Sequence, residues 1–266
     1  MCYNLNGDNM EINKIVKMKD NKYKIYIEDE SIITYDNVIL ENDLLYKKNV
    51  DSNLYKKIIL DTEYYDVYNK SVKYILKKKR SENEIYKYLK KFDIDDNKIN
   101  KIVNKLKDLK LINDLEYCKS FINDKIYLSK CGINKIRIEL LEQNIPYDII
   151  EEELKKVDTN ILNERLEKLI LKKINSNKKH SNYLLKQKIL NEMINLGYDK
   201  NNILEIIDNN LKDNLKVLNN EFDKIYLKFK NKYSGIELQN KLKQKLIQKG
   251  FNIEDINKLL KQKTEE

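Results

Sequence analysis

The side chains that most often carry out chemistry in proteins are scarce in this chain of 266 residues. It contains one histidine, His180, and three cysteines at irregular spacing, Cys2, Cys118 and Cys131. A zinc site needs closely spaced Cys and His ligands, and a disulfide framework needs an even set of cysteines. We therefore expect neither a metal ion nor disulfides, and we expect His180 to be a surface loop residue rather than a ligand.

The five glycines do not form a phosphate-binding loop. They never occur at P-loop or GxGxxG spacing, and none stands in a GxSxG elbow. Among the 43 acidic residues no pair stands out as a general acid and base. We therefore expect a protein that is not an enzyme and binds no cofactor.

The remaining chemistry is recognition of negative charge by basic side chains. The formal net charge is +9, and it is unevenly distributed. Residues 1–68 hold 9 basic and 13 acidic side chains, whereas residues 69–266 hold 43 and 30. This surplus favours a partner that carries phosphate or an acidic surface. The alternative, that 49 lysines against 3 arginines only reflect codon usage, stays open.

The densest basic run is Lys77-Lys78-Lys79-Arg80, which we expect to end a helix. Arg80 is the best single candidate for partner contact, because a guanidinium binds carboxylate or phosphate with two parallel hydrogen bonds. The alternative is structural, since cations at a helix C-terminus complement the helix dipole and often remain in water.

A second basic group surrounds the helix start that we expect after Gly132: Lys130, Lys135 and Arg137. The secondary candidates are two tyrosines and two lysines. Tyr86 and Tyr88 lie close to the basic run and could stack on nucleic-acid bases. Lys178 and Lys179 lie in a predicted loop and are more typical of a solvated surface.

Two segments near the N-terminus, EINKIVKM and KYKIYIEDESIITY, alternate apolar and polar residues as half-buried strands do. In the second segment, residues 28–31 predict a hairpin turn. We expect residues 1–68 to form a small α+β domain, with antiparallel strands and one or two short helices at about 37–66.

From about residue 69 onward the chain repeats at intervals of 51, 53 and 53 residues. Four apolar reference positions mark the repeat: Leu89, Leu140, Met193 and Leu246. Four residues later stand residues that tolerate positive φ: Asp93, Asn144, Gly197 and Gly250. Ten residues after each reference comes an isoleucine: Ile99, Ile150, Ile203 and Ile256. This pattern predicts a helix, a tight turn and a second buried helix in each repeat.

Each repeat has room for a third, leading helix, at about 70–79, 115–128, 160–175 and 211–230. We therefore expect a mainly α protein of tandem three-helix (helix-turn-helix-like) repeats in an elongated curved array. The predicted repeats are 69–112, 113–158, 159–210 and 211–266. Ser81-x-x-Glu84 and Ser234-x-x-Glu237 have capping-box spacing and mark two helix starts. The apolar stripe of the last leading helix favours packing over dimerisation, so we expect a monomer.

Three segments of the repeat region resemble motifs of the RecX family of recombinase regulators. They are residues 80–85 (RSENEI), 106–118 (LKDLKLINDLEYC) and 132–140 (GINKIRIEL). The chain departs from the family pattern with Asn144 in place of glycine, Ile85 in place of leucine and Cys118 in place of alanine. The resemblance is clear over about 70–210, and the N-terminal strands look like the extra domain of longer members.

The resemblance implies a non-enzymatic, cytoplasmic regulator of RecA that acts in homologous recombination, DNA repair and the SOS response. Its partner would be the RecA–single-stranded DNA filament, in whose groove such proteins lie and whose ATP hydrolysis and strand exchange they generally suppress. Two alternatives remain: a stand-alone nucleic-acid-binding protein, and an adaptor that binds only protein. The sequence contains no apolar run long enough to span a membrane and no secretory signal.

Overall fold

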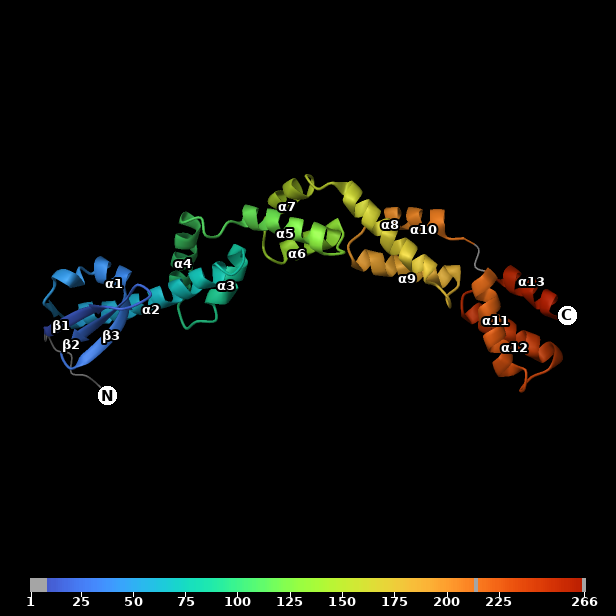
Figure 1. The fold of residues 1–266 in the computed structure, drawn as a ribbon, viewed down its shortest axis with the longest axis horizontal. Coiled ribbons are helices and arrows are strands. Elements are labelled where there is room, and N and C mark those ends of the chain that lie inside the picture. Colours follow the sequence, from blue (N-terminus) through green and yellow to red (C-terminus); the bar gives the residue numbers. More distant parts are fainter. Residues whose placement is uncertain (1–8, 213–214, 265–266) are drawn as a thin grey trace. The chain divides into compact units, whose positions relative to one another are not determined.

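The computed structural model describes residues 9–212 and 215–264, which are mainly helical with one small N-terminal sheet (Figure 1). This agrees with the predicted fold class. The chain divides into two compact units, Met1–Ser120 and Phe121–Glu266, and the division falls within helix α5 (Asp114–Leu128). The domain boundaries given above stay a prediction, and Cys2 lies outside the described residues.

The N-terminal sheet is antiparallel, with the strand order β3-β2-β1-β4. Its strands are β1 (Met10–Lys17), β2 (Lys22–Ile27), β3 (Glu30–Tyr35) and the short β4 (Asn49–Val50). The alternation of β2 buries Ile25 and Ile27, as the sequence predicts. The hairpin turn is shorter than predicted, because Glu30 and Ser31 already pair with β2. Glu28 has a φ of 48° in this turn.

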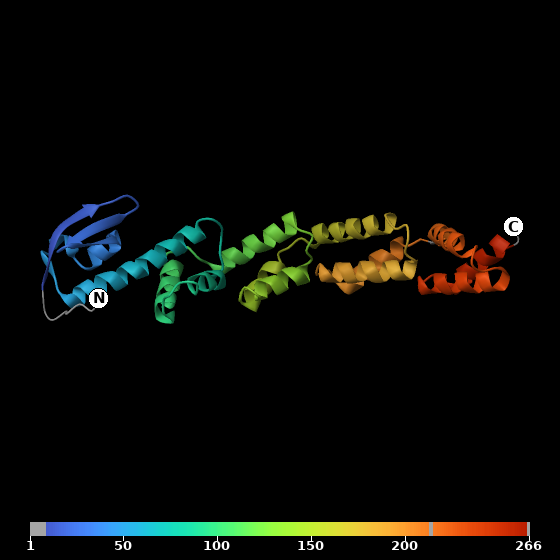
Figure 2. The same cartoon turned by 90° about the horizontal axis from the view of Figure 1, so that it is seen from below.

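A long helix, α2 (Ser52–Ile75), lies against the sheet together with α1 (Asp36–Glu41) and the short 3-10 helix η1 (Leu44–Tyr46) (Figure 2). Ile58 and Tyr65 of α2 pack into the core of the sheet, whereas Val67 and Ile75 pack into the core of the first helical repeat. The predicted separate helix at 70–79 is therefore wrong. A single helix serves both cores, because its apolar residues divide between them.

The first unit continues with α3 (Glu82–Leu89) and α4 (Asp96–Asp108) before α5. The predicted capping box at the start of α3 is confirmed. The Glu84 N–H donates to the Ser81 hydroxyl at 3.1 Å, and the Ser81 N–H donates to a Glu84 carboxylate oxygen at 3.2 Å. These bonds satisfy donors that a helix start otherwise leaves unpaired.

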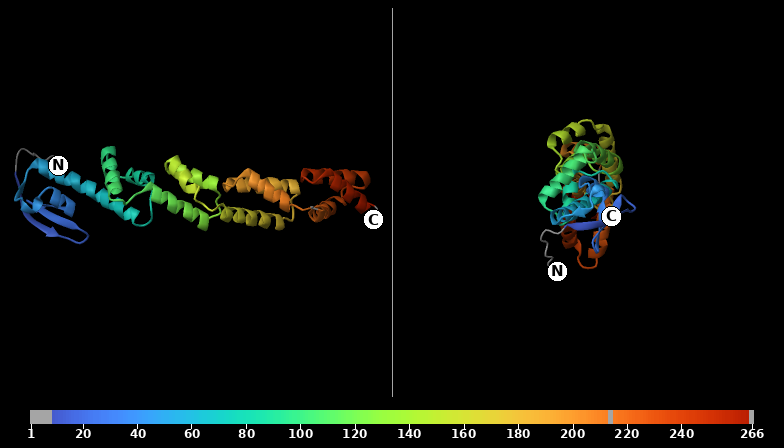
Figure 3. Two further views of the ribbon diagram at one scale, coloured as in Figure 1. Left: turned by 90° about the horizontal axis from the view of Figure 1, so that it is seen from above. Right: turned by 90° about the vertical axis from the view of Figure 1, so that its left-hand side faces the viewer.

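Over its described residues, the second unit contains the rest of α5 and eight further helices. These are α6 (Ile133–Leu141), α7 (Tyr147–Leu154), α8 (Thr159–Asn175), α9 (Asn182–Asn195), α10 (Lys200–Asn210), α11 (Leu215–Phe229), α12 (Gly235–Gln248) and α13 (Ile253–Thr264). The last three helices share a core of their own (Figure 3). Helix α12 begins where predicted, although the Ser234 side chain makes no capping hydrogen bond.

The repeat is confirmed at its buried positions. The four reference residues and the four isoleucines ten residues later are each 0% exposed: Leu89, Leu140, Met193, Leu246, Ile99, Ile150, Ile203 and Ile256. At the turn, Asn144, Gly197 and Gly250 have positive φ values of 58°, 88° and 76°. Asp93 does not, so the first repeat closes its turn differently from the other three.

Candidate partner-binding surface

The basic run Lys77-Lys78-Lys79-Arg80 lies in the turn between α2 and α3. The prediction that it ends a helix is wrong, because α2 ends at Ile75. Lys77, Lys78 and Lys79 are exposed, and the Lys79 ammonium lies 3.8 Å from a carboxylate oxygen of Glu116. An exposed pair at this distance holds its partners weakly. The turn therefore presents three ammonium groups to solvent.

Arg80 faces the protein interior instead. Its side chain is only 14% exposed, and Nη1 donates to a carboxylate oxygen of Glu84 at 3.1 Å. The guanidinium carbon lies 3.9 Å from the ring centroid of Tyr74, a cation–π contact. Arg80 thus ties the start of α3 to the end of α2. Its contact with a partner stays a prediction, and the exposed charge of the run belongs to the lysines.

A pocket of about 370 Å³ opens beside this turn, within the first unit. It is lined by Lys79, Arg80, Lys110, Leu111, Asn113, Glu116 and Tyr117. Lys110 could not be predicted from the sequence as part of this site, because only the packing of the turn between α4 and α5 brings it near the basic run. A hydrogen bond from Lys119 lowers the pKa of Glu116, and burial raises the pKa of Tyr117 to about 12. The pocket therefore combines three cations with one carboxylate at neutral pH.

Tyr86 and Tyr88 are both half-buried. The Tyr88 ring stacks on Tyr74 with centroids 4.1 Å apart, and it meets Phe92 edge-on at 5.2 Å. The Lys90 ammonium lies 5.5 Å from the ring centroid of Tyr86. These contacts give both tyrosines a packing role, and stacking on bases stays a prediction.

The second candidate group lies in the second unit, around the start of α6. Lys130 is exposed in the preceding loop, whereas Lys135 and Arg137 are half-buried. Arg137 binds Glu151 on α7 with two hydrogen bonds, from Nε at 2.5 Å and from Nη2 at 3.3 Å. A third bond joins Arg137 to the side chain of Asn134 at 2.7 Å. Arg137 therefore locks α6 to α7, and Lys130 is the exposed cation of this group.

All three arginines of the chain make contacts that hold neighbouring helices together. Arg80 and Arg137 hold neighbouring carboxylates, and Arg165 on α8 donates to the main-chain carbonyl of Ile126 on α5. The planar guanidinium carries several donors in a fixed geometry, which suits a half-buried position between two helices. Lysine thus supplies most of the exposed positive charge.

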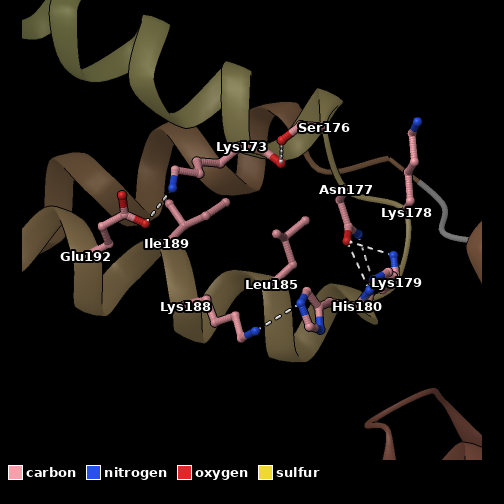
Figure 4. Close-up of a pocket in the computed structure, with 10 residues that line it drawn as sticks. All are labelled: Lys173, Ser176, Asn177, Lys178, Lys179, His180, Leu185, Lys188, Ile189 and Glu192. Carbon is pink, nitrogen blue, oxygen red and sulfur yellow. Dashed lines mark hydrogen bonds and ion pairs between the residues drawn. The ribbon is translucent and has the colours of Figure 1, made fainter.

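Lys178 and Lys179 are exposed in the loop between α8 and α9, which borders a pocket of about 370 Å³ (Figure 4). The Asn177 side chain fixes this loop. Its oxygen accepts from the N–H groups of Lys179 and His180 at 3.3 and 3.0 Å, and its amide donates to the His180 carbonyl at 2.7 Å. His180 is half-buried rather than on the open surface, and Nε2 lies 2.9 Å from Nζ of Lys188.

Within the described ranges, no three His, Cys, Asp or Glu side chains gather closely enough to hold a metal ion. Cys118 and Cys131 are buried, as small apolar residues are. Across residues 9–212 and 215–264, no helix combines the length and the apolar character that crossing a membrane requires.

The chain is similar to known proteins along nearly its whole length. A protein named Regulatory protein RecX from Streptococcus agalactiae is 30% identical over 269 residues, which cover 95% of this chain and 99% of the relative. A protein of the same name from Streptococcus pneumoniae is 29% identical over the same shares. The crystal structure of a regulatory protein RecX has the same fold over 75% of this chain and 99% of its own, with a TM-score of 0.64 at 23% identity. No protein-family model matches the chain.

Proposed function

Because this chain belongs to the RecX family, we propose that it regulates the RecA recombinase. It binds the RecA–single-stranded DNA filament and inhibits ATP hydrolysis and strand exchange. It thereby limits homologous recombination and the DNA repair that depends on recombination during the SOS response. It acts as a monomer in the cytoplasm, without catalysis and without a cofactor. The observation that carries the proposal is the similarity to a regulatory protein over 95% of this chain.

The exposed lysines favour a partner that carries negative charge. Lys77, Lys78 and Lys79 extend from one turn, and Lys110 lines the pocket beside them. Phosphate groups and acidic protein surfaces both attract such a cluster, and both occur on a protein filament wound around DNA. We propose that this cluster contacts the filament, with Lys130 on the second unit as a further contact.

The direct test adds the purified protein, at less than one molecule per RecA, to RecA, ATP and single-stranded DNA. We expect slower ATP hydrolysis and slower strand exchange. Unchanged rates of both would contradict the proposal. Tight DNA binding in the absence of RecA, with a steep dependence on salt, would instead favour a stand-alone nucleic-acid-binding protein. Salt-insensitive binding to a protein, without affinity for DNA, would favour an adaptor.

The contact surface is tested with the triple variant Lys77→Glu, Lys78→Glu and Lys79→Glu. Arg80 is left in place, because its substitution would disturb the start of α3. We expect weaker filament binding with unchanged helical content. The matched control reverses the same number of charges at Lys47, Lys56 and Lys57, which are also in the first unit. Equal loss in both variants would mean that net charge, and not this turn, determines binding.

A further inference from the structure

We propose that the pocket between α8 and α9 binds a phosphate group, held by Lys179, Lys188 and His180. The phosphate belongs either to a nucleic-acid backbone or to a small phosphate compound. The site lies within the second unit, apart from the lysines of the α2–α3 turn. The inference therefore rests on the geometry of this pocket and not on the proposed regulation of RecA.

The pocket has an apolar wall and a basic rim. Leu185 and Ile189 extend from α9 toward α8, while Lys188 and His180 point toward one another at the edge (Figure 4). At about 370 Å³, the pocket has room for a phosphate group.

The positive charge of the rim is only partly neutralised. Lys173 is paired with Glu192 at 2.8 Å, and Lys178 extends away from the other labelled side chains (Figure 4). Among the described residues, no carboxylate forms an ion pair with Lys179 or Lys188. The pocket therefore keeps two lysine charges that form no ion pair with a carboxylate of the described residues.

The charges around His180 come from four elements. Lys179 belongs to the same loop, Lys188 to α9, Glu221 to α11, and Lys249 follows α12. Glu221 does not balance the lysines of the pocket, because its carboxylate already accepts hydrogen bonds from Lys224 at 2.7 Å and from Lys249 at 2.5 Å. The imidazole thus lies in a net positive field.

The protonation of His180 responds to that field. Burial lowers the pKa of His180 first, and the charges of Lys188 and Lys179 lower it further. At neutral pH the imidazole is therefore uncharged, and Nε2 can accept a hydrogen bond from the Lys188 ammonium. A bound phosphate supplies the missing negative charge, so it favours the protonated imidazole and raises the pKa. Conversely, phosphate binds more tightly as the pH falls through the pKa of His180.

The loop is already arranged for binding. The three hydrogen bonds of Asn177 hold the main chain of Lys179 and His180, so an anion orders only the ends of the lysine side chains. Pre-organisation of this kind reduces the entropy lost on binding.

The test follows the imidazole signals of His180 by NMR, which are unambiguous because the chain has one histidine. The full-length protein, without RecA, is titrated with pH in chloride, in inorganic phosphate and with a short oligothymidylate, all at equal ionic strength. We expect phosphate or the oligonucleotide to raise the pKa of His180 by about half a unit or more. A shift with both probes identifies the phosphate group itself as the ligand, and a shift with the oligonucleotide alone identifies the nucleic-acid backbone.

Two variants separate the pocket from general attraction. Lys179→Gln and Lys188→Gln should each reduce the ligand-induced shift by at least half. The control Lys168→Gln removes a lysine of α8 that is 79% exposed and does not line the pocket, and it should keep the full shift. The proposal is overturned if the pKa is the same with and without both ligands, or if the control loses as much of the shift as the pocket variants. Neither result bears on regulation of RecA, because RecA is absent.

Discussion

Gly197 and Lys135 approach so closely that no side chain fits between them. A Cβ atom on Gly197 would lie 2.3 Å from the main-chain nitrogen of Lys135 and 2.5 Å from its Cβ. The Gly197 carbonyl accepts a hydrogen bond from the Asn134 N–H at 3.0 Å, and the Gly132 N–H donates to the Leu196 carbonyl at 2.7 Å. The turn that ends α9 is therefore also the surface that docks on the start of α6.

The next junction also places a turn glycine against the start of a helix, here through side-chain contacts. A Cβ atom on Gly250, at the turn that ends α12, would lie 2.8 Å from the Ser181 hydroxyl and 3.2 Å from Leu184 at the start of α9. Each glycine thus meets two demands, a positive φ and contact with the preceding repeat. Within the second unit, a turn glycine therefore contacts the preceding repeat at two successive junctions.

Replacement of Gly197 by alanine should destabilise the protein strongly. The substitution combines an unfavourable positive φ, which costs about 1 kcal/mol, with overpacking against Lys135, which adds about 1–3 kcal/mol. Gly235 is the matched control, because its φ is 54° and a Cβ atom there would meet nothing within 4 Å beyond its own helix and chain neighbours. Urea unfolding should give a clearly lower midpoint for Gly197→Ala than for Gly235→Ala. Equal midpoints would mean that the close approach of Gly197 to Lys135 does not affect stability.

Arg80 should matter for stability as well as for charge. Arg80→Gln removes the ion pair with Glu84 and the cation–π contact with Tyr74, so we expect a loss of about 1–2 kcal/mol in the free energy of unfolding. Lys78→Gln removes one charge from an exposed position of the same turn and should change it by less than about 0.5 kcal/mol. If both variants unfold alike in urea, Arg80 does not stabilise the start of α3.

Glu221 should make the free energy of unfolding decrease as the pH becomes acidic. Burial by itself raises the pKa of this carboxyl, whose side chain is 5% exposed, but the hydrogen bonds and charges of Lys224 and Lys249 outweigh it and lower the pKa. A lowered folded-state pKa means that the stabilisation is fully present above the unfolded pKa and disappears as the pH falls through the folded one.

Urea unfolding between pH 7 and pH 3 measures this effect. Glu221→Gln should lose stability at pH 7 and show a shallower decline toward acid than the wild type. Glu164→Gln, at a side chain that is 70% exposed, should retain the wild-type pH dependence. Parallel curves for Glu221→Gln and the wild type would argue against the buried ion-pair cluster.

Arg137 and Glu151 should be energetically coupled, because two hydrogen bonds join them across α6 and α7. Both side chains are about three-quarters buried, so we expect a coupling energy of about 1 kcal/mol from a double-mutant cycle with Arg137→Gln and Glu151→Gln. The parallel cycle with Glu152, which is 72% exposed and pairs with Lys156, should give a coupling close to zero. Similar coupling energies in both cycles would mean that Arg137 and Glu151 do not specifically hold α6 to α7.

The buried positions of the repeats could be predicted from the sequence because they are periodic. Leu140 and Ile150 are fully buried where the spacing predicts it, and Asn144 and Gly197 have the positive φ that the turn requires. The extent of α2 could not be predicted in this way. Its residues divide between two cores, so no single periodic stripe marks the whole helix.

The sequence by itself determined the N-terminal antiparallel strands, the helical repeat and the surplus of positive charge, since these depend on residue types at fixed local spacing. Only the tertiary structure decided which charges remain in solvent. Arg80 turns toward Tyr74 and Lys110 comes to lie beside Lys79, and both relationships depend on how helices pack. Such side-chain contacts leave no periodic trace in the sequence, because each satisfies one side chain at one place in the fold.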